Sequence, residues 1–244
     1  STLDRSSAAS DVYKRQFTDI AVLEDGKITV HKLPSTPSDP SKGILQGVQE
    51  TGVTSAEFVH GSTVATNALL EGKGSRTALV TTMGFEDVLE IGRQSRSELY
   101  NLEMDRAPAL SPWSLRFGLP ERGDHTGRIV EDLDPEAIKT LIGLLEENGA
   151  EAVAVSFLFS FLNTSHEEMV LNALEKMEKP PYISISSRVL PEFREYERAS
   201  TVVVNAYVGE VMSRYLSELE RPLGKNLRIM QSSGGSITAG LASE

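Results

Sequence analysis

Cysteine is missing from the 244-residue chain. Its absence excludes disulfide scaffolds, cysteine-ligated zinc, iron–sulfur clusters and thiol catalysis. Long apolar runs are missing too, because none approaches the roughly 20 residues that cross a bilayer. Residues 1–16 lack the positively charged stretch and apolar core of a secretory signal. We therefore expect a cytoplasmic protein that does not enter a membrane.

Basic residues are scarce relative to acidic ones. Lys and Arg total 24 against 35 Asp and Glu, so the formal net charge is −11. Nucleic-acid binding needs a clustered positive face to neutralise phosphates, and the sequence clusters none. Hydrophobic residues make up 39% and charged residues 24%, ordinary values for a globular chain that handles small molecules or proteins. The length fits one large domain or two small ones.

Several common catalytic motifs are also absent. The glycine–lysine–glycine at 72–74 lacks the spacing of a phosphate-binding Walker loop, and the sequence has neither G-x-S-x-G nor G-x-G-x-x-G. His166 is not followed by a second histidine at helical spacing, which excludes a zincin site. The histidines form no ligand cluster in sequence and are His31, His60, His125 and His166.

Strand and helix patterns alternate along the chain. An Asp-Gly pair between two alternating segments predicts a hairpin over 17–33. The other predicted strands are 58–60, 76–82, 127–133, 152–159, 182–186 and 227–231. The predicted helices are 39–50, 61–70, 85–91, 134–149, one opened by a capping box at 164–167, and 192–220. This alternation predicts an α/β fold, with 93–124 as a long loop or insertion.

Thr18 and Asp19 lie at the mouth of the predicted hairpin. A carboxylate there suits Mg²⁺, which prefers oxygen ligands and usually keeps water between itself and the protein. The adjacent hydroxyl suits a hydrogen bond to phosphate. Ordinary strand-edge residues produce the same pattern, so the residues alone leave both interpretations open.

The segment His60–Asn67 places a glycine turn between a strand and a helix. Backbone N–H groups and hydroxyls at a helix start suit an anion. Thr63, Thr66 and Asn67 fall within one predicted helical turn. A helix start that is merely capped by hydroxyls is the alternative interpretation.

Arg93 and Arg96 flank Gln94 in a loop after a predicted helix. Guanidinium groups in such a loop are able to hold a carboxylate or phosphate bidentately. Solvated surface charge is the alternative. The charge-dense segment 192–198 favours a solvated first helical turn with local ion pairs.

Five segments together resemble the hydantoinase A / 5-oxoprolinase / acetone carboxylase β family. They are FTDIAVLEDGKITVHKLPSTPSDPSKGILQGV, FVHGSTVATNALLEGKGSRTALVTTMGFEDVLEIGRQ, AVAVSFLFSFLNTSHE, VLPEFREYERASTVVVNAYVG and LRIMQSSGG. The match is nearly collinear from Phe17 to the last residue. The resemblance implies a truncated α/β fold similar to actin, sugar kinases and heat-shock ATPases, a ribonuclease H-like mixed sheet with flanking helices.

The resemblance also implies an activity. Family members use ATP, usually with Mg²⁺, and we expect a hydrolase that opens a lactam or hydantoin ring through phosphorylation of its carbonyl oxygen. The alternatives are an ATP-dependent acetone- or acetophenone-type carboxylase subunit and a non-catalytic actin-like ATP-binding module. The implied substrate is a small cyclic amide. The implied partner is a hydantoinase B-type subunit or domain in a homo- or hetero-oligomer.

The resemblance assigns expected roles to individual residues. Thr18 and Asp19 belong to the first phosphate loop as cofactor-binding residues, with Asp19 as the metal ligand. The expected catalytic residues are His60, Thr63 and Arg93. The expected substrate-binding residues are Thr66, Asn67, Gln94 and Arg96. No general base is assigned.

The ends of the chain fall outside the family pattern. Residues 1–16 are polar, lack periodic order and resemble a translated sequencing-adapter segment, with a disordered tail as the alternative. We expect 17–190 to be the hydantoinase/oxoprolinase N-terminal domain and 191–244 the truncated beginning of the core domain. The glycines of the family's first phosphate loop are replaced, and its second loop would lie beyond Glu244. We therefore predict a fragment that neither binds ATP tightly nor turns over alone.

Overall fold

The computed structural model describes residues 17–34, 36, 39–53, 57–94 and 108–243. The chain forms two compact units. Unit 1 comprises 1–65 and 212–244, and unit 2 comprises 66–211. Strands and helices alternate as predicted, which confirms the α/β class. Within the described ranges, no helix combines the length and apolar character needed to cross a membrane.

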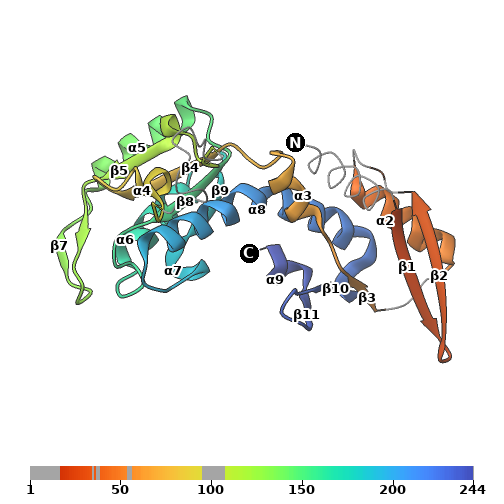
Figure 1. The fold of residues 1–244 in the computed structure, drawn as a ribbon. Coiled ribbons are helices and arrows are strands. Elements are labelled where there is room, and N and C mark those ends of the chain that lie inside the picture. The colour runs from red at the N-terminus through yellow and green to blue at the C-terminus, as the bar shows by residue number, and fades with distance from the viewer. Residues whose placement is uncertain (1–16, 35, 37–38, 54–56, 95–107, 244) are drawn as a thin grey trace, which may run out of the picture. The chain divides into compact units, whose positions relative to one another are not determined.

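Unit 2 is built on a parallel four-stranded sheet of order β5-β4-β8-β9 (Figure 1). Its strands are β4 (Thr77–Thr82), β5 (Arg116–Leu119), β8 (Ala152–Ser156) and β9 (Tyr182–Ile185). Every residue of the two central strands, β4 and β8, is buried. Continuous burial is typical of parallel strands, because helices cover both faces of their sheet.

Helices pack on the two faces of this sheet. One face is covered by α5 (Pro135–Glu147) and α6 (Ser165–Leu174), and the other by α4 (Val88–Ile91) and the first part of α8 (Glu195–Leu223). Successive strand residues point to opposite faces. The sheet residues on the α5–α6 side therefore alternate with those on the α8 side, and the latter are Leu79, Ala152 and Ala154.

Shorter elements complete unit 2. A small hairpin joins β6 (Arg122–Gly123) to β7 (Ile129–Glu131), and α7 (Ser186–Val189) follows β9. A 3₁₀ turn at Trp113–Leu115 leads directly into β5. The prediction of an irregular segment over 93–124 was therefore wrong for its end, although 95–107 lie outside the described residues. The strand β5 was not predicted because four residues with prolines on both sides give no recognisable period-2 pattern.

The start of α6 corrects another prediction. Thr164 forms no side-chain cap, so the expected capping box is absent. Instead the Oδ1 atom of Asn163 accepts hydrogen bonds from the backbone N–H and the hydroxyl of Ser165, at 3.1 and 2.7 Å. Glu167, the expected box partner, turns into the interior and accepts a hydrogen bond from the backbone N–H of Phe157 at 3.1 Å.

The first part of unit 1 is the predicted antiparallel hairpin of β1 (Phe17–Glu24) and β2 (Lys27–Pro34). Its turn residues Asp25 and Gly26 both have positive φ, 48° and 76°, as a tight hairpin turn requires. Helix α2 (Pro40–Thr51) packs on this hairpin through Gly47. A Cβ atom there would overlap the ends of the Ile20 and Leu33 side chains, so any larger residue would require both side chains to shift.

A three-stranded mixed sheet forms the rest of unit 1. Its order is β11-β10-β3, with β10 parallel to β3 and antiparallel to β11. The strands are β3 (Phe58–His60), β10 (Leu227–Met230) and β11 (Ser236–Thr238), followed by α9 (Ala239–Ser243). The unit also contains α3 (Val64–Leu70) in part, the 3₁₀ turn Gly224–Asn226, and the last part of α8. Its core gathers Tyr215, Leu216, Leu219, Leu227 and Ile229.

Candidate functional site

The expected phosphate-loop residues lie on β1 in unit 1. Thr18 is half-buried, whereas the side chain of Asp19 is 64% exposed. The ammonium of Lys32 lies across the hairpin, 3.8 Å from the Oδ1 atom of Asp19. Among the residues that the structure describes, no three His, Asp or Glu side chains gather into a metal-binding group. Asp19 therefore presents an accessible carboxylate that belongs to no such group.

His60 lies at the end of β3, and its ring is half-buried. Its Nε2 atom lies 2.7 Å from the hydroxyl of Tyr215 on α8, within the same unit. Burial lowers the pKa of His60, and burial raises the pKa of Tyr215 to about 12. Both shifts favour the neutral pair, and the tautomer of His60 sets which of the two groups donates. The imidazole of this expected catalytic residue is thus already engaged.

The expected anion-binding turn leads into a short helix that is capped by a hydroxyl. Thr63 stands just before α3, which has seven residues. The cap of this helix comes from Ser62, whose Oγ atom accepts a hydrogen bond from the Val64 N–H at 3.1 Å. Thr66 is exposed and Asn67 is half-buried. The turn therefore contains a helix start capped by a hydroxyl, which was the alternative to an anion-binding site.

Arg93 is held by α8 in unit 2. Its Nε and Nη2 atoms both contact the Oε1 atom of Glu197. The pKa of Glu197 is lowered, first by its own backbone N–H and further by Arg93. Gln94 adopts a left-handed backbone with φ of 53°, whereas Arg96 lies outside the described residues. The expected site residues thus fall into both units, with Thr18, Asp19, His60 and Thr63 in unit 1 and Thr66, Asn67, Arg93 and Gln94 in unit 2.

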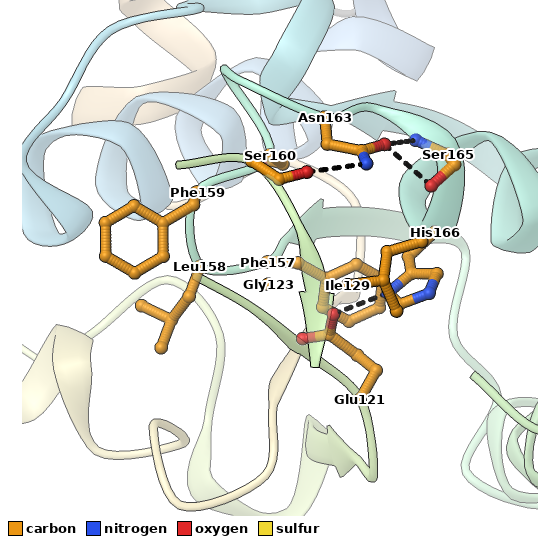
Figure 2. A pocket seen from close by; sticks show the side chains of 11 residues that line it. Glu121, Gly123, Ile129, Phe157, Leu158, Phe159, Ser160, Asn163, Ser165 and His166 are labelled. Atoms are coloured by element: carbon orange, nitrogen blue, oxygen red, sulfur yellow. Dashed lines mark hydrogen bonds and ion pairs between the residues drawn. The ribbon is translucent and has the colours of Figure 1, made fainter. Parts of the chain in front are cut away.

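A buried polar cluster that the sequence did not predict lies at the carboxyl end of the parallel sheet (Figure 2). Thr82 ends β4, Glu121 follows β5, and His166 is the second residue of α6. Their exposed fractions are only 2%, 3% and 6%. Ligands of open α/β sheets bind at this carboxyl end. The cluster is therefore a second candidate site, contained entirely in unit 2.

A directional hydrogen-bond chain joins this cluster. The backbone N–H of Leu158 donates to the Oγ1 atom of Thr82 at 3.0 Å. The hydroxyl hydrogen of Thr82 is then directed to the Oε1 atom of Glu121. The other carboxylate oxygen, Oε2, lies 2.7 Å from the Nδ1 atom of His166. With both oxygens of Glu121 acting as acceptors, Nδ1 carries the hydrogen and the orientation of the ring is fixed.

Glu167 connects the ends of β8 and β9. Its fully buried carboxylate accepts hydrogen bonds from the backbone N–H groups of Phe157 and Ser187 and from the hydroxyl of Ser186, at 3.1, 2.8 and 2.6 Å. Beside it, the Nη2 atom of Arg198 donates to the Phe157 carbonyl at 2.6 Å. Burial lowers the pKa of Arg198, and the Glu167 charge opposes that shift. Glu167 and Arg198 thus connect the segments that follow β8 and β9 to α6 and α8.

A small cavity adjoins the Glu121–His166 pair. Its volume of about 10 Å³ suits a single water molecule. Ser160, Asn163 and Phe159 contribute to its wall (Figure 2). Phe159 has a positive φ of 56°, a strained backbone for a non-glycine residue and a feature often found at functional sites.

The sequence contained one signal for this cluster. Polar residues stand directly after buried apolar runs at Thr82 and Ser160, and the ends of parallel strands meet at one edge of a sheet. Glu121 was hidden within the segment predicted to be irregular. The capping-box interpretation of 164–167 includes His166 and Glu167 and gives neither of them a role in a site.

Comparison with known families now identifies the chain. Residues 16–178 match the hydantoinase/oxoprolinase N-terminal region, and residues 198–244 match the hydantoinase/oxoprolinase family. The chain belongs to the hydantoinase/oxoprolinase family. This confirms the resemblance inferred from the sequence. The fold of two α/β units with several sheets is consistent with an actin-like architecture.

Three of the curated relatives are named enzymes or enzyme subunits. Caprolactamase subunit alpha of Pseudomonas jessenii is 34% identical over 238 residues, which cover 90% of this chain and 34% of the relative. Acetophenone carboxylase gamma subunit of Aromatoleum aromaticum is 34% identical over 80% of this chain and 30% of its own length. Arabidopsis thaliana 5-oxoprolinase 1 is 35% identical over 72% of the chain and 16% of its own. The chain thus spans about a third or less of these relatives.

Solved structures agree with these relatives. The ATP-dependent caprolactamase of Pseudomonas jessenii superposes with a TM-score of 0.81 at 33% identity, over 91% of this chain and 35% of that one. Nucleotide-free acetone carboxylase superposes with a TM-score of 0.78 at 25% identity, over 92% and 36%. Both similarities cover nearly all of the present chain.

Proposed function

We propose that this chain is the N-terminal part of an ATP-dependent hydrolase that opens a cyclic amide. The observation that carries this proposal is the similarity to caprolactamase, which extends over 91% of the chain in three dimensions. The match of 16–178 to the hydantoinase/oxoprolinase N-terminal region supports it. ATP, when bound, would supply the phosphoryl group that activates the ring carbonyl.

Thr18 and Asp19 would hold the nucleotide side of this site. The Asp19 carboxylate is exposed and belongs to no group of three or more acids or histidines in the described part of the chain. This donor set fits Mg²⁺, which keeps several waters and combines one or two carboxylates with phosphate oxygens. Thr18 would hydrogen-bond phosphate. We also propose a cytoplasmic location. The proposed domains are those predicted from the sequence, 17–190 and the beginning of a second domain at 191–244.

Arg93, Thr66, Asn67 and Gln94 would form the substrate side within unit 2. The guanidinium of Arg93 is already oriented by Glu197 on α8. A carbonyl or carboxylate oxygen of the substrate would accept hydrogen bonds from this guanidinium. The remaining expected residue, Arg96, would belong to the same side.

The decisive experiment uses the complete open reading frame with its hydantoinase B-type partner. Ring opening of 5-oxoproline, caprolactam and hydantoins is followed with ATP and Mg²⁺, and ADP is measured in parallel. ATP-dependent ring opening of any of these compounds is expected. ADP release without ring opening of any of them would contradict the proposal. The chain of 244 residues alone is expected to show no micromolar Mg·ATP binding by calorimetry.

A carboxylase subunit is the second candidate. The similarity to acetone carboxylase, with a TM-score of 0.78, specifically favours it. The same assay distinguishes the two, because a carboxylase would fix labelled bicarbonate onto a ketone such as acetone or acetophenone. Ketone-dependent incorporation without ring opening would select this candidate.

A further inference from the structure

Arg194 has a strained backbone directly before α8. Its φ is 81°, in the left-handed region that a non-glycine residue adopts only at a cost in free energy. Its carbonyl oxygen accepts a hydrogen bond from the backbone N–H of Arg198 at 3.1 Å, which fixes this conformation against the first turn of the helix. Strain of this kind gathers at sites where function requires a side chain in a fixed place. The strain thus points to a role for the side chain of Arg194.

The guanidinium of Arg194 is presented to solvent on an aromatic ring. Its Cζ atom lies 5.4 Å from the centroid of the Phe193 ring, and Phe193 is itself 67% exposed. Within the described ranges no carboxylate, including that of the neighbouring Glu192, forms an ion pair with Arg194. By contrast, the exposed Arg188 of the same unit is paired with Glu168 at 3.0 Å. Arg194 is therefore an oriented cation that an anionic ligand can reach.

A second guanidinium acts on the same carboxylate. Arg93 contacts the Oε1 atom of Glu197 directly, through its Nε and Nη2 atoms. The pKa of Glu197 is lowered first by its own backbone N–H and further by the charges of Arg93 and Arg194. Glu195, the next acid in this segment, acts on the buried Arg198 instead. Arg93 and Arg194 thus share one carboxylate, which balances only one of their two positive charges.

The segment that contains Arg93 is fixed against the same turn of α8. Gly92 packs on the ring of Tyr196, whose nearest atoms lie 3.6 Å from the position of a Cβ atom on this glycine. Gln94 has a positive φ of 53°. Of the four non-glycine residues with positive φ in the described part of the chain, Gln94 and Arg194 are thus both at this contact. Two strained segments therefore hold the two guanidinium groups.

We propose that Arg194 and Arg93 bind a phosphoryl group, with Glu197 as the positioning residue of Arg93. A phosphoryl group has up to two negative charges and three oxygen atoms, which suit hydrogen bonds from two guanidinium groups. A carboxylate has one charge and two oxygens, and one guanidinium satisfies it bidentately. Within the proposed function, on which this inference rests, the group is the phosphoryl that ATP supplies to the ring carbonyl. Arginine side chains stabilise the charge of such a group during its transfer.

The first test reads the two guanidinium groups in the 244-residue chain. Their Nε–Hε signals are followed in ¹H–¹⁵N spectra during titration with inorganic phosphate at constant ionic strength. Arg194→Gln and Arg93→Gln assign the two signals by their loss. Saturable shifts of both signals are expected with phosphate but not with acetate. The Nε–Hε signal of Arg188 is the control, because Glu168 already accepts hydrogen bonds from that guanidinium.

Three outcomes of this titration would overturn the proposal. Equal shifts with acetate would mean a carboxylate site. Shifts that do not saturate, or that Arg188 shares, would mean an adventitious ion only. Unshifted signals in both titrations would mean that the two arginines are surface charges.

The second test uses the strain at Arg194. Glycine adopts a positive φ freely, so Arg194→Gly is expected to raise the urea midpoint of unfolding. The same variant is expected to abolish the phosphate-dependent shift of the Arg93 signal. A full shift in this variant would mean that Arg93 binds phosphate alone and would overturn the role of Arg194. A lowered urea midpoint would mean that the Arg194 side chain stabilises the fold, which would overturn the inference drawn from its strain.

The third test uses the complete open reading frame with its partner. Arg194→Ala is expected to lower kcat for ring opening about 10-fold or more, because an arginine on a transferring phosphoryl group stabilises its charge. Added guanidinium ion, at a concentration that leaves the protein folded, is expected to restore part of the activity. A merely structural side chain would not allow this rescue. Arg188→Ala is the matched control and is expected to leave kcat unchanged.

The outcomes separate this inference from the proposed function. Ring opening by the wild type with a fully active Arg194→Ala variant would overturn the role of Arg194 and leave the proposed function standing. A wild type that opens no cyclic amide, although its arginine signals respond to phosphate, would overturn the proposed function and leave the phosphoryl site standing. Saturable phosphate binding together with guanidinium rescue of ring opening would support both.

Discussion

The hydroxyl of Tyr215 lies 2.7 Å from Nε2 of His60, and this contact connects α8 to the end of β3. Removing the hydroxyl in Tyr215→Phe leaves a half-buried ring nitrogen without its hydrogen-bond partner. We expect a loss of about 1 kcal/mol in the free energy of unfolding, the usual contribution of such a hydrogen bond. Urea unfolding of the chain measures it. Tyr196→Phe is the control, because the Tyr196 hydroxyl makes no hydrogen bond within the described residues, and an equal loss there would contradict the prediction.

The same pair predicts a pH dependence of stability. Burial lowers the pKa of His60 below its ordinary 6.5, so the folded chain binds a proton less readily than the unfolded chain. The stability contributed by neutral His60 is therefore complete above about pH 6.5 and is lost as the pH falls through the folded pKa. Unfolding curves at pH 7.5 and 5.5 check this. His60→Gln is expected to reduce the difference between the two curves, and an unchanged difference would count against it.

Arg93 offers a test of the proposed substrate side. Arg93→Ala in the complete protein is expected to lower kcat/KM for ring opening about 10-fold or more, because hydrogen bonds to charged groups contribute roughly 1.5–3 kcal/mol. The melting temperature should stay nearly unchanged, since the side chain of Arg93 is 60% exposed. Glu197→Gln removes the same ion pair but keeps the guanidinium. Equal losses of kcat/KM in both variants would mean that Arg93 acts only through its ion pair with Glu197 on α8.

The buried carboxylate of Glu167 carries a prediction about folding. Glu167→Gln replaces one of the two acceptor oxygens by an amide nitrogen, which then faces either the Phe157 N–H or the Ser187 N–H. An unsatisfied buried donor costs roughly 1–3 kcal/mol, so we expect a loss of that size in the free energy of unfolding. The neighbouring Glu168 pairs with Arg188 near the surface at 3.0 Å. Glu168→Gln should change stability by about 0.5 kcal/mol or less, and similar effects of the two variants would contradict the structure.

Local patterns predicted most of the framework. The Asp-Gly pair between two alternating segments predicted the hairpin, and 58–60 is a strand with the predicted bounds. The long helix begins at Glu195 and ends at Leu223, close to the predicted 192–220. These elements are long or are bounded by strong turn residues, so local chemistry determines them. The strand β5 was not predicted because it has only four residues and follows irregular chain.

The second candidate site could not be predicted because it is made by distant contacts. Glu121 and His166 lie on different elements, and only the parallel pairing of β5, β4 and β8 places the ends of those strands at one edge. A polar helix start such as 164–167 has the same local pattern whether its side chains cap the helix or turn inward. The inward orientation of Glu167 depends on hydrogen-bond donors that follow β8 and β9, and these donors are distant in the sequence.

Two helical glycines give opposite predictions for one substitution. Gly143 on α5 has no neighbouring atom within 4 Å of a Cβ position, so Gly143→Ala should stabilise the chain by about 1 kcal/mol through helix propensity. At Gly209 on α8 the added Cβ would overlap the ring of Tyr182, which packs in the same core. Gly209→Ala should therefore destabilise the chain by about 1–3 kcal/mol despite the same gain in propensity. Urea unfolding of both variants measures the difference, and a stabilised Gly209→Ala would mean that α8 does not pack on Tyr182 at this position.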